Sequence, residues 1–143
     1  MNIKAAWNTD APYDNESQLL RRVLFGNAAF STLTGLLCLF DAASLTRAFA
    51  IPDPLLLPGL GVQLLIFASA IIWVATRTRL PITFAWTIIC LDIAWVVGSA
   101  ALLPFVSNVL SASGLAALIL IAFSVASFAT GQIVGVRRLQ RIQ

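Results

Sequence analysis

Histidine is absent from the 143-residue sequence, and charged residues make up only 10% of it. Without histidine the chain lacks the side chain most often used as a metal ligand, a haem ligand or a general base. Metalloenzymes and catalysts of the Ser-His-Asp or Cys-His type are therefore poor interpretations, and we expect no catalytic residues, no metal and no cofactor. A soluble domain carries roughly 25% charged residues, so the low value also argues against a soluble protein.

Cysteine is almost as scarce, with only Cys38 and Cys90. Both fall inside apolar runs, and they are far from the Cys-x-x-Cys spacing of a redox or metal site. We therefore expect two small buried side chains rather than a disulfide.

Apolar residues make up 59% of the chain and gather in four long runs. A helix needs about 20 such residues to cross about 30 Å of hydrocarbon. The runs lack the period-two alternation of a barrel strand, so they are predicted to be helices. The predicted fold is an all-α integral membrane protein, a four-transmembrane-helix bundle. Residues 1–17 form a cytoplasmic arm and residues 18–143 the transmembrane domain, with spans at about 18–41, 55–76, 81–105 and 110–137.

The basic residues are distributed unevenly over the segments that flank these runs. All nine except Arg47 fall on the side that holds both chain ends: Lys4, Arg21, Arg22, Arg77, Arg79, Arg137, Arg138 and Arg141. In membrane proteins the cytoplasmic loops carry the excess of Lys and Arg. We therefore predict a multi-pass protein of a bacterial-type inner membrane with both termini in the cytoplasm. The same distribution explains the net charge of +3 without a nucleic-acid partner.

The start of the first span allows an alternative. Arg21–Phe25 loosely resembles a twin-arginine export signal, and Ala48–Ala50 has the small-x-small form of a cleavage site. A retained span with a basic inner flank is the simpler interpretation. We expect Asp14 or Asn15 to cap the helix that enters the membrane.

The two halves of the sequence resemble each other. Asn27–Phe30 aligns with Asp92–Trp95, and further along Gly59–Leu60 aligns with Gly114–Leu115, in the same order. This pattern predicts two repeated helical hairpins related by a pseudo-two-fold axis along the membrane normal. The halves differ in their outer connections, because 41–54 has the pattern of a short amphipathic segment at the membrane interface.

Asp92 is the one acidic residue that interrupts an apolar run. Because a helix rises about 1.5 Å per residue, Asp92 lies about 16 Å beyond Pro81, deep in the bilayer. A carboxylate there costs about 2.5 to 3.5 kcal/mol, and no Lys, Arg or His within a run compensates it. The helical spacing of polar residues predicts an intramembrane polar centre formed by Asp92, Asn27, Ser31, Ser124 and Ser127.

Two roles for this centre remain open. In the first, Asp92 is protonated, donates a hydrogen bond to Asn27 or to a serine, and fixes how the hairpins meet. In the second, Asp92 takes up and releases protons or holds a cationic substrate, as intramembrane acids do in transporters. Asp92→Asn is expected to preserve the first role and to abolish the second.

Three functional hypotheses follow. The favoured one is a non-enzymatic scaffold, subunit or assembly factor of a membrane complex, because the loops are short and no catalytic constellation is present. The alternative is a small oligomeric proton-coupled transporter or exporter that uses Asp92. An enzyme acting on a lipid or a quinone is least supported, since no second acid in a span pairs with Asp92. The expected partners are the lipid bilayer and either further copies of the chain or a larger membrane complex.

In size and four-span layout the sequence resembles the small multidrug-resistance exporters, although no motif is shared. This resemblance implies transport by an oligomer. Those exporters carry their essential acid on the first helix, where this chain has Asn27, and the acid of this chain falls on the third span.

Overall fold

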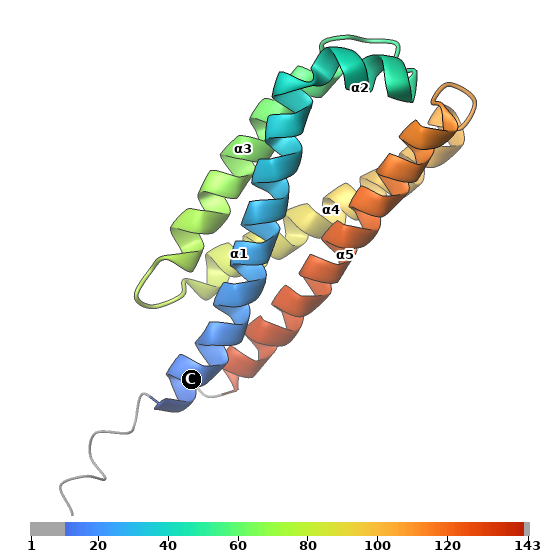
Figure 1. Cartoon of the computed structure of the whole chain (residues 1–143). Coiled ribbons are helices and arrows are strands. Elements are labelled where there is room, and N and C mark those ends of the chain that lie inside the picture. Colours follow the sequence, from blue (N-terminus) through green and yellow to red (C-terminus); the bar gives the residue numbers. More distant parts are fainter. Residues whose placement is uncertain (1–10, 142–143) are drawn as a thin grey trace, which may run out of the picture.

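The computed structural model describes residues 11–141 (Figure 1). Within this range there are five helices: α1 Ala11–Phe40, α2 Ala42–Phe49, α3 Leu56–Ala75, α4 Ile82–Val106 and α5 Ala112–Gln140. All except α2 are long and apolar enough to cross a membrane, with candidate spans at Ser17–Phe40, Leu56–Ala75, Ile82–Val106 and Ala112–Gln140. The prediction of an all-α chain with four long apolar helices is confirmed, and α2 adds a short fifth helix.

Helix α1 is already formed at Ala11, within the segment predicted as an arm. Asp14 and Asn15 lie inside this helix, so the prediction that one of them caps its start is wrong. The sequence is compatible with a helix here, because proline is tolerated in a first turn, as at Pro12, and acidic residues favour helix N-termini. Residues 1–10 of the predicted arm lie outside the described part of the chain.

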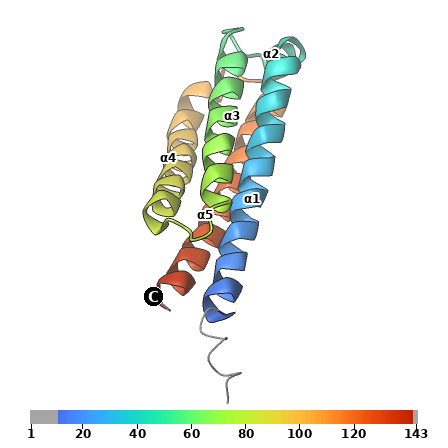
Figure 2. The ribbon, with the colours of Figure 1, turned by 90° about the vertical axis from the view of Figure 1, so that its left-hand side faces the viewer.

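The long helices form two antiparallel pairs (Figures 1 and 2). α1 packs along α3, and α4 packs along α5. α1 also packs against α5, whereas α3 and α4 approach each other at few positions. The bundle is therefore continuous through α1 and α5 but loosely joined between α3 and α4.

The four long helices converge at the end where α1 starts and α5 finishes, which we call the closed end (Figure 1). The hydrophobic core lies there and consists of aliphatic side chains from all four helices and the α3–α4 loop: Leu20, Leu24, Ala28, Ile71, Val74, Ala75, Leu80, Ala85, Ile88, Ile89, Val136 and Leu139. Towards the opposite, open end the α1–α3 pair diverges from the α4–α5 pair, and α2 bridges the two (Figure 1). The core shared by all four long helices is thus confined to the closed half of the molecule.

Arg21 ties α1 to the end of α3 at the closed end. Its guanidinium donates to the carbonyl oxygens of Ala75, Arg77 and Thr78, the last at 3.0 Å. The final carbonyls of a helix have no partner within the helix. Arg21 therefore caps α3 and fixes the loop that leads to α4.

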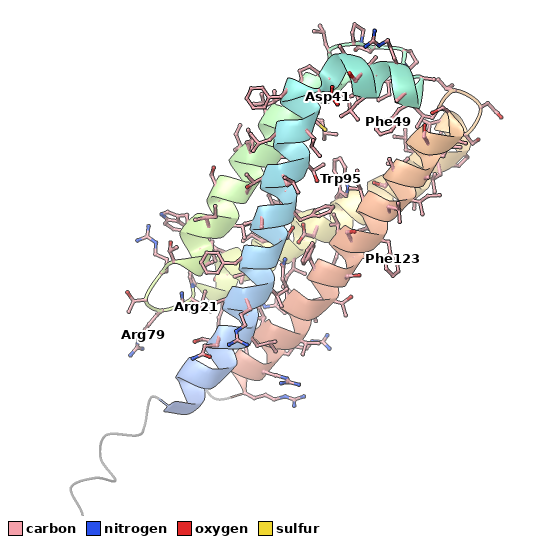
Figure 3. The ribbon with its side chains drawn as sticks, in the orientation of Figure 1. Arg21, Asp41, Phe49, Arg79, Trp95 and Phe123 are labelled. Carbon is pink, nitrogen blue, oxygen red and sulfur yellow. The ribbon has the colours of Figure 1, made fainter. Side chains whose placement is uncertain are left out.

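Helix α2 docks on the start of α5 at the open end (Figure 3). The hydroxyls of Ser111 and Ser113 donate to the Ala48 carbonyl at 2.7 and 2.9 Å, and the Ser111 N–H donates to the Phe49 carbonyl at 3.0 Å. Gly114 makes this approach possible, because a Cβ at that position would lie 2.8 Å from the Phe49 carbonyl oxygen. The segment predicted from its amphipathic pattern is therefore a helix that links the two pairs.

Candidate functional site

Asp92 lies near the middle of α4 and is only 2% exposed. Its Oδ2 accepts hydrogen bonds from Asn27 Nδ2 on α1 at 2.7 Å and from Gln132 Nε2 on α5 at 3.0 Å. Ser31 extends the chain of contacts, because its hydroxyl donates to Asn27 Oδ1 at 3.4 Å. These four buried side chains, which we call the Asp92 network, connect three of the long helices.

The Asp92 network lies directly beside the hydrophobic core. Ile89 precedes Asp92 by about one turn on α4, and Val136 follows Gln132 by one turn on α5. Both of these aliphatic side chains are wholly buried. The core therefore separates the carboxyl group from the closed end, and its hydrogen bonds form in an apolar environment where they are electrostatically stronger than in water.

The structure brings together Asp92, Asn27 and Ser31 of the predicted polar centre but leaves out both serines of α5. The Ser124 hydroxyl donates to the Leu120 carbonyl at 2.8 Å, and the Ser127 hydroxyl donates to the Phe123 carbonyl at 2.9 Å. Such bonds to the preceding turn satisfy a serine without any partner helix. Neither serine takes part in the Asp92 network.

Gln132 is the member of the Asp92 network that the sequence interpretation missed. The spacing of polar residues predicts Ser124 and Ser127 on the inner face of the fourth span. In the structure, the buried face of α5 in this region carries Val125, Ala129 and Gln132 instead. The signal was nevertheless present, because a glutamine within a long apolar run needs a hydrogen-bond partner. Its carbonyl oxygen Oε1 is buried and has no hydrogen-bond partner among the described residues.

A cavity of about 520 Å³ opens next to the Asp92 network, on the side of the open end. Side chains from α1, α3, α4 and α5 line it: Phe30, Ser31, Thr34, Gln63, Leu64, Ile66, Phe67, Ala70, Leu91, Asp92, Ala94, Trp95, Ile121 and Val125. Ligand pockets of proteins typically measure about 300 to 1,000 Å³ and combine apolar walls with a few polar groups. The cavity has the size and lining of a small-molecule site.

The mouth of the cavity lies between α3 and α4. Its exposed lining residues belong to these two helices, and the largest are Ile66, which is 67% exposed, and Leu91, which is 52% exposed. The α1 and α5 sides are closed by buried groups such as Ser31 and Val125. The mouth therefore lies between two helices that are long and apolar enough to cross a membrane.

Among the residues that line the cavity, Asp92 and Trp95 each keep a polar atom without a hydrogen-bond partner within the described chain. Both hydrogen bonds to Asp92 end on Oδ2, so none of the described residues occupies Oδ1. The indole Nε1 of Trp95 is buried and also lacks a hydrogen-bond partner. Trp95 follows Asp92 by almost one turn of α4 and lies in the space between α1 and α5 (Figure 3). The cavity lining thus includes a free carboxylate oxygen of Asp92, while the unpaired N–H of Trp95 is buried.

No family model, curated protein or solved structure matches this chain.

Proposed function

We propose that this chain is a non-enzymatic membrane protein that takes up a small lipid-soluble molecule from the bilayer into the cavity beside Asp92. The observation that carries the proposal is a pocket of about 520 Å³ with mostly apolar walls, lined by Asp92, whose Oδ1 accepts no hydrogen bond from the described residues. Leaving polar groups without partners in an apolar environment is costly, and a ligand that bonds to them removes that cost. A transporter or exporter uses such a site as the midpoint of its transport path.

This proposal favours the transport alternative over the scaffold, subunit or assembly-factor hypothesis. Exposed apolar residues such as Leu33, Ile119 and Leu120 are explained by contact with lipid alone, so they do not call for a protein partner. A scaffold, in contrast, does not require a cavity beside a buried acid. Coupling to protons would be carried by Asp92, the one acid among the residues that line the cavity.

We further propose an inner-membrane location, with the closed end and both termini facing the cytoplasm. All basic residues of the described part except Arg47 flank the closed end, which supports this orientation by the excess of positive charge in cytoplasmic loops. Reporter domains fused to the two ends are expected to give a cytoplasmic signal in both cases. Signals from opposite compartments would refute the orientation.

The two helix pairs are proposed to be repeated hairpins. The hydrogen bond between Asn27 and Asp92 supports this, because these residues are equivalent in the sequence alignment of the two halves and equivalent residues meet at a two-fold axis. The pairs are not packed symmetrically, since α1 lies against α5 while α3 hardly touches α4. We attribute the cavity to this difference between the halves.

Filling the cavity tests the proposed function. Ala94 lines the cavity, whereas Ala101 is exposed on the same helix and does not line it, so Ala94→Phe and Ala101→Phe form a matched pair. We expect native mass spectrometry to detect a bound small molecule on the wild type and on Ala101→Phe but not on Ala94→Phe. Equal occupancy in all three proteins, or phospholipid as the only bound species, would refute the proposal.

Transport itself is tested with proteoliposomes. Proton-driven uptake of the molecule identified by mass spectrometry is expected for the wild type and for Ser99→Ala, which changes another buried polar residue of α4. Asp92→Asn is expected to show no proton-driven uptake. If Asp92→Asn takes up the molecule as fast as the wild type, Asp92 does not couple transport to protons.

A further inference from the structure

We infer that the ligand of this cavity is a lipophilic amine, whose nitrogen pairs with the free oxygen of Asp92 and whose apolar body fills the rest of the cavity. This inference rests on the proposed function and adds the chemical class of the ligand. It combines three features of the cavity, namely an acid without a cation, a tryptophan beside it, and apolar walls that open to lipid.

The first feature is the charge of the cavity. Asp92 is the acidic residue of the lining, and within the described part of the chain no Lys or Arg lines the cavity. The hydrogen bonds from Asn27 and Gln132 hold Oδ2 and come from neutral amides, so they add no positive charge. A basic nitrogen of the ligand supplies the positive charge that the cavity lining lacks. Charge-assisted hydrogen bonds are roughly twice as strong as neutral ones.

The amine and Asp92 form the same ion pair whether Asp92 is protonated or ionised before the ligand binds. A neutral amine that arrives from lipid takes the proton of a protonated carboxyl, so that the O–H bond breaks, an N–H bond forms, and an ammonium remains paired with the carboxylate. An amine that is already protonated pairs directly with an ionised carboxylate. Both routes end with Oδ1 accepting a hydrogen bond from the nitrogen, while Oδ2 keeps its two amide donors.

Trp95 provides the second feature. Its side chain lines the cavity almost one helical turn from Asp92, so the indole ring and the carboxyl group border the same space. Aromatic rings attract cations within about 6 Å of the ring centre, and tryptophan does so most strongly.

The apolar walls are the third feature. Phe30 of α1, Phe67 of α3 and Val125 of α5 surround the space away from Asp92, and the mouth between α3 and α4 faces lipid. A molecule that reaches this site must first dissolve in the bilayer, which excludes small hydrophilic cations. An aryl or alkyl body attached to one basic nitrogen meets both requirements.

Calorimetric titration of the purified full chain in mild detergent tests this assignment with three probes. The probes are dimethyl(phenylpropyl)amine, its carbon analogue with CH in place of nitrogen, and phenylbutanol as a neutral hydrogen-bond donor. Each is titrated into the wild type, Asp92→Asn, and Ser99→Ala as a matched control. Partition of a probe into micelles is the same for every variant, so ratios between variants report on the protein.

We expect the wild type and Ser99→Ala to bind the amine at least ~10-fold more tightly than either neutral probe, as a charge-assisted hydrogen bond implies. Asp92→Asn is expected to lose this preference. Trp95→Leu leaves the Asp92 network intact and is expected to weaken amine binding by roughly threefold to tenfold, with little change for the carbon analogue. This second variant keeps the test decisive if Asp92→Asn does not fold.

The outcomes separate the ligand class from the proposed function. If the neutral probes bind the wild type as tightly as the amine and Ala94→Phe blocks them, the amine assignment is wrong while the cavity remains a binding site. Amine binding that is unchanged in Asp92→Asn likewise overturns the assignment. If Ala94→Phe blocks none of the probes, or none binds the wild type, the inference and the proposed function both fail.

Discussion

Gly35 and Gly61 allow α1 and α3 to approach closely where the two helices cross. Enlarging one of these glycines tests the packing of the pair. A Cβ added to Gly61 would lie 2.7 Å from the Gly35 carbonyl oxygen, 2.8 Å from Leu39 Cγ and 3.2 Å from the Leu39 nitrogen. Leu39 Cγ can rotate away, but the other two atoms belong to the α1 backbone. Gly61→Ala must therefore push the two helices apart by roughly 0.8 Å, since non-bonded atoms attract best at about 3.5 to 4.0 Å.

We expect Gly61→Ala to lower the free energy of unfolding by about 1 to 3 kcal/mol, the usual cost of overpacking. The matched control is Gly59→Ala on the same helix, where a Cβ meets nothing within 4 Å. Alanine stabilises a helix over glycine by roughly 0.5 to 1 kcal/mol, so the control is expected to be neutral or slightly more stable. Unfolding in mixed micelles of increasing SDS fraction, followed by circular dichroism, measures both. Equal stability of the two variants would refute the close approach of α1 and α3.

Three further predictions concern stability and use the same unfolding assay. Asp92→Leu is expected to lower the free energy of unfolding by about 1 to 3 kcal/mol, because it leaves two buried amide donors without an acceptor. Replacing both amide partners by leucine as well is expected to recover the lost stability. Arg21→Gln is expected to destabilise the protein by about 1 to 2 kcal/mol and to speed tryptic cleavage in the α3–α4 loop. Arg22 is an exposed neighbour, and Arg22→Gln is expected to have neither effect. Ala50→Gly is expected to stabilise by about 1 kcal/mol, because Ala50 has a left-handed φ of 55° that glycine adopts without strain.

The spans could be predicted because each depends only on composition along the chain. The runs around Leu56–Ala75 and Ile82–Val106 have no competing interpretation at their length and hydropathy, and the predicted bounds differ from the observed helices by one residue at each end. The start of α1 could not be predicted in the same way. Residues after Ala11 are polar and carry no apolar period, so their helix follows from continuity with the span rather than from a pattern.

The candidate site could be predicted only in part, because its members lie on different helices. Asn27 and Asp92 were found by depth and by the repeat, which need no knowledge of how a helix is rotated. Choosing between Ser127 and Gln132 on α5 does need that knowledge, since neighbouring residues of a helix point about 100° apart. The cavity could not be predicted from the sequence, because it arises from the divergence of two helix pairs and not from any local pattern.

The free-energy cost of burying Asp92 in the bilayer argues for a role beyond packing. Placing a carboxylate near the bilayer centre costs about 2.5 to 3.5 kcal/mol, whereas hydrogen bonds between membrane helices contribute about 0.6 kcal/mol each on average. The two amide bonds from Asn27 and Gln132 therefore do not offset the cost. Apolar residues at these three positions would give a bundle at least as stable. A polar network that is no more stable than apolar packing, and that leaves one carboxylate oxygen free beside a cavity, is explained when that oxygen binds a molecule that the cavity admits.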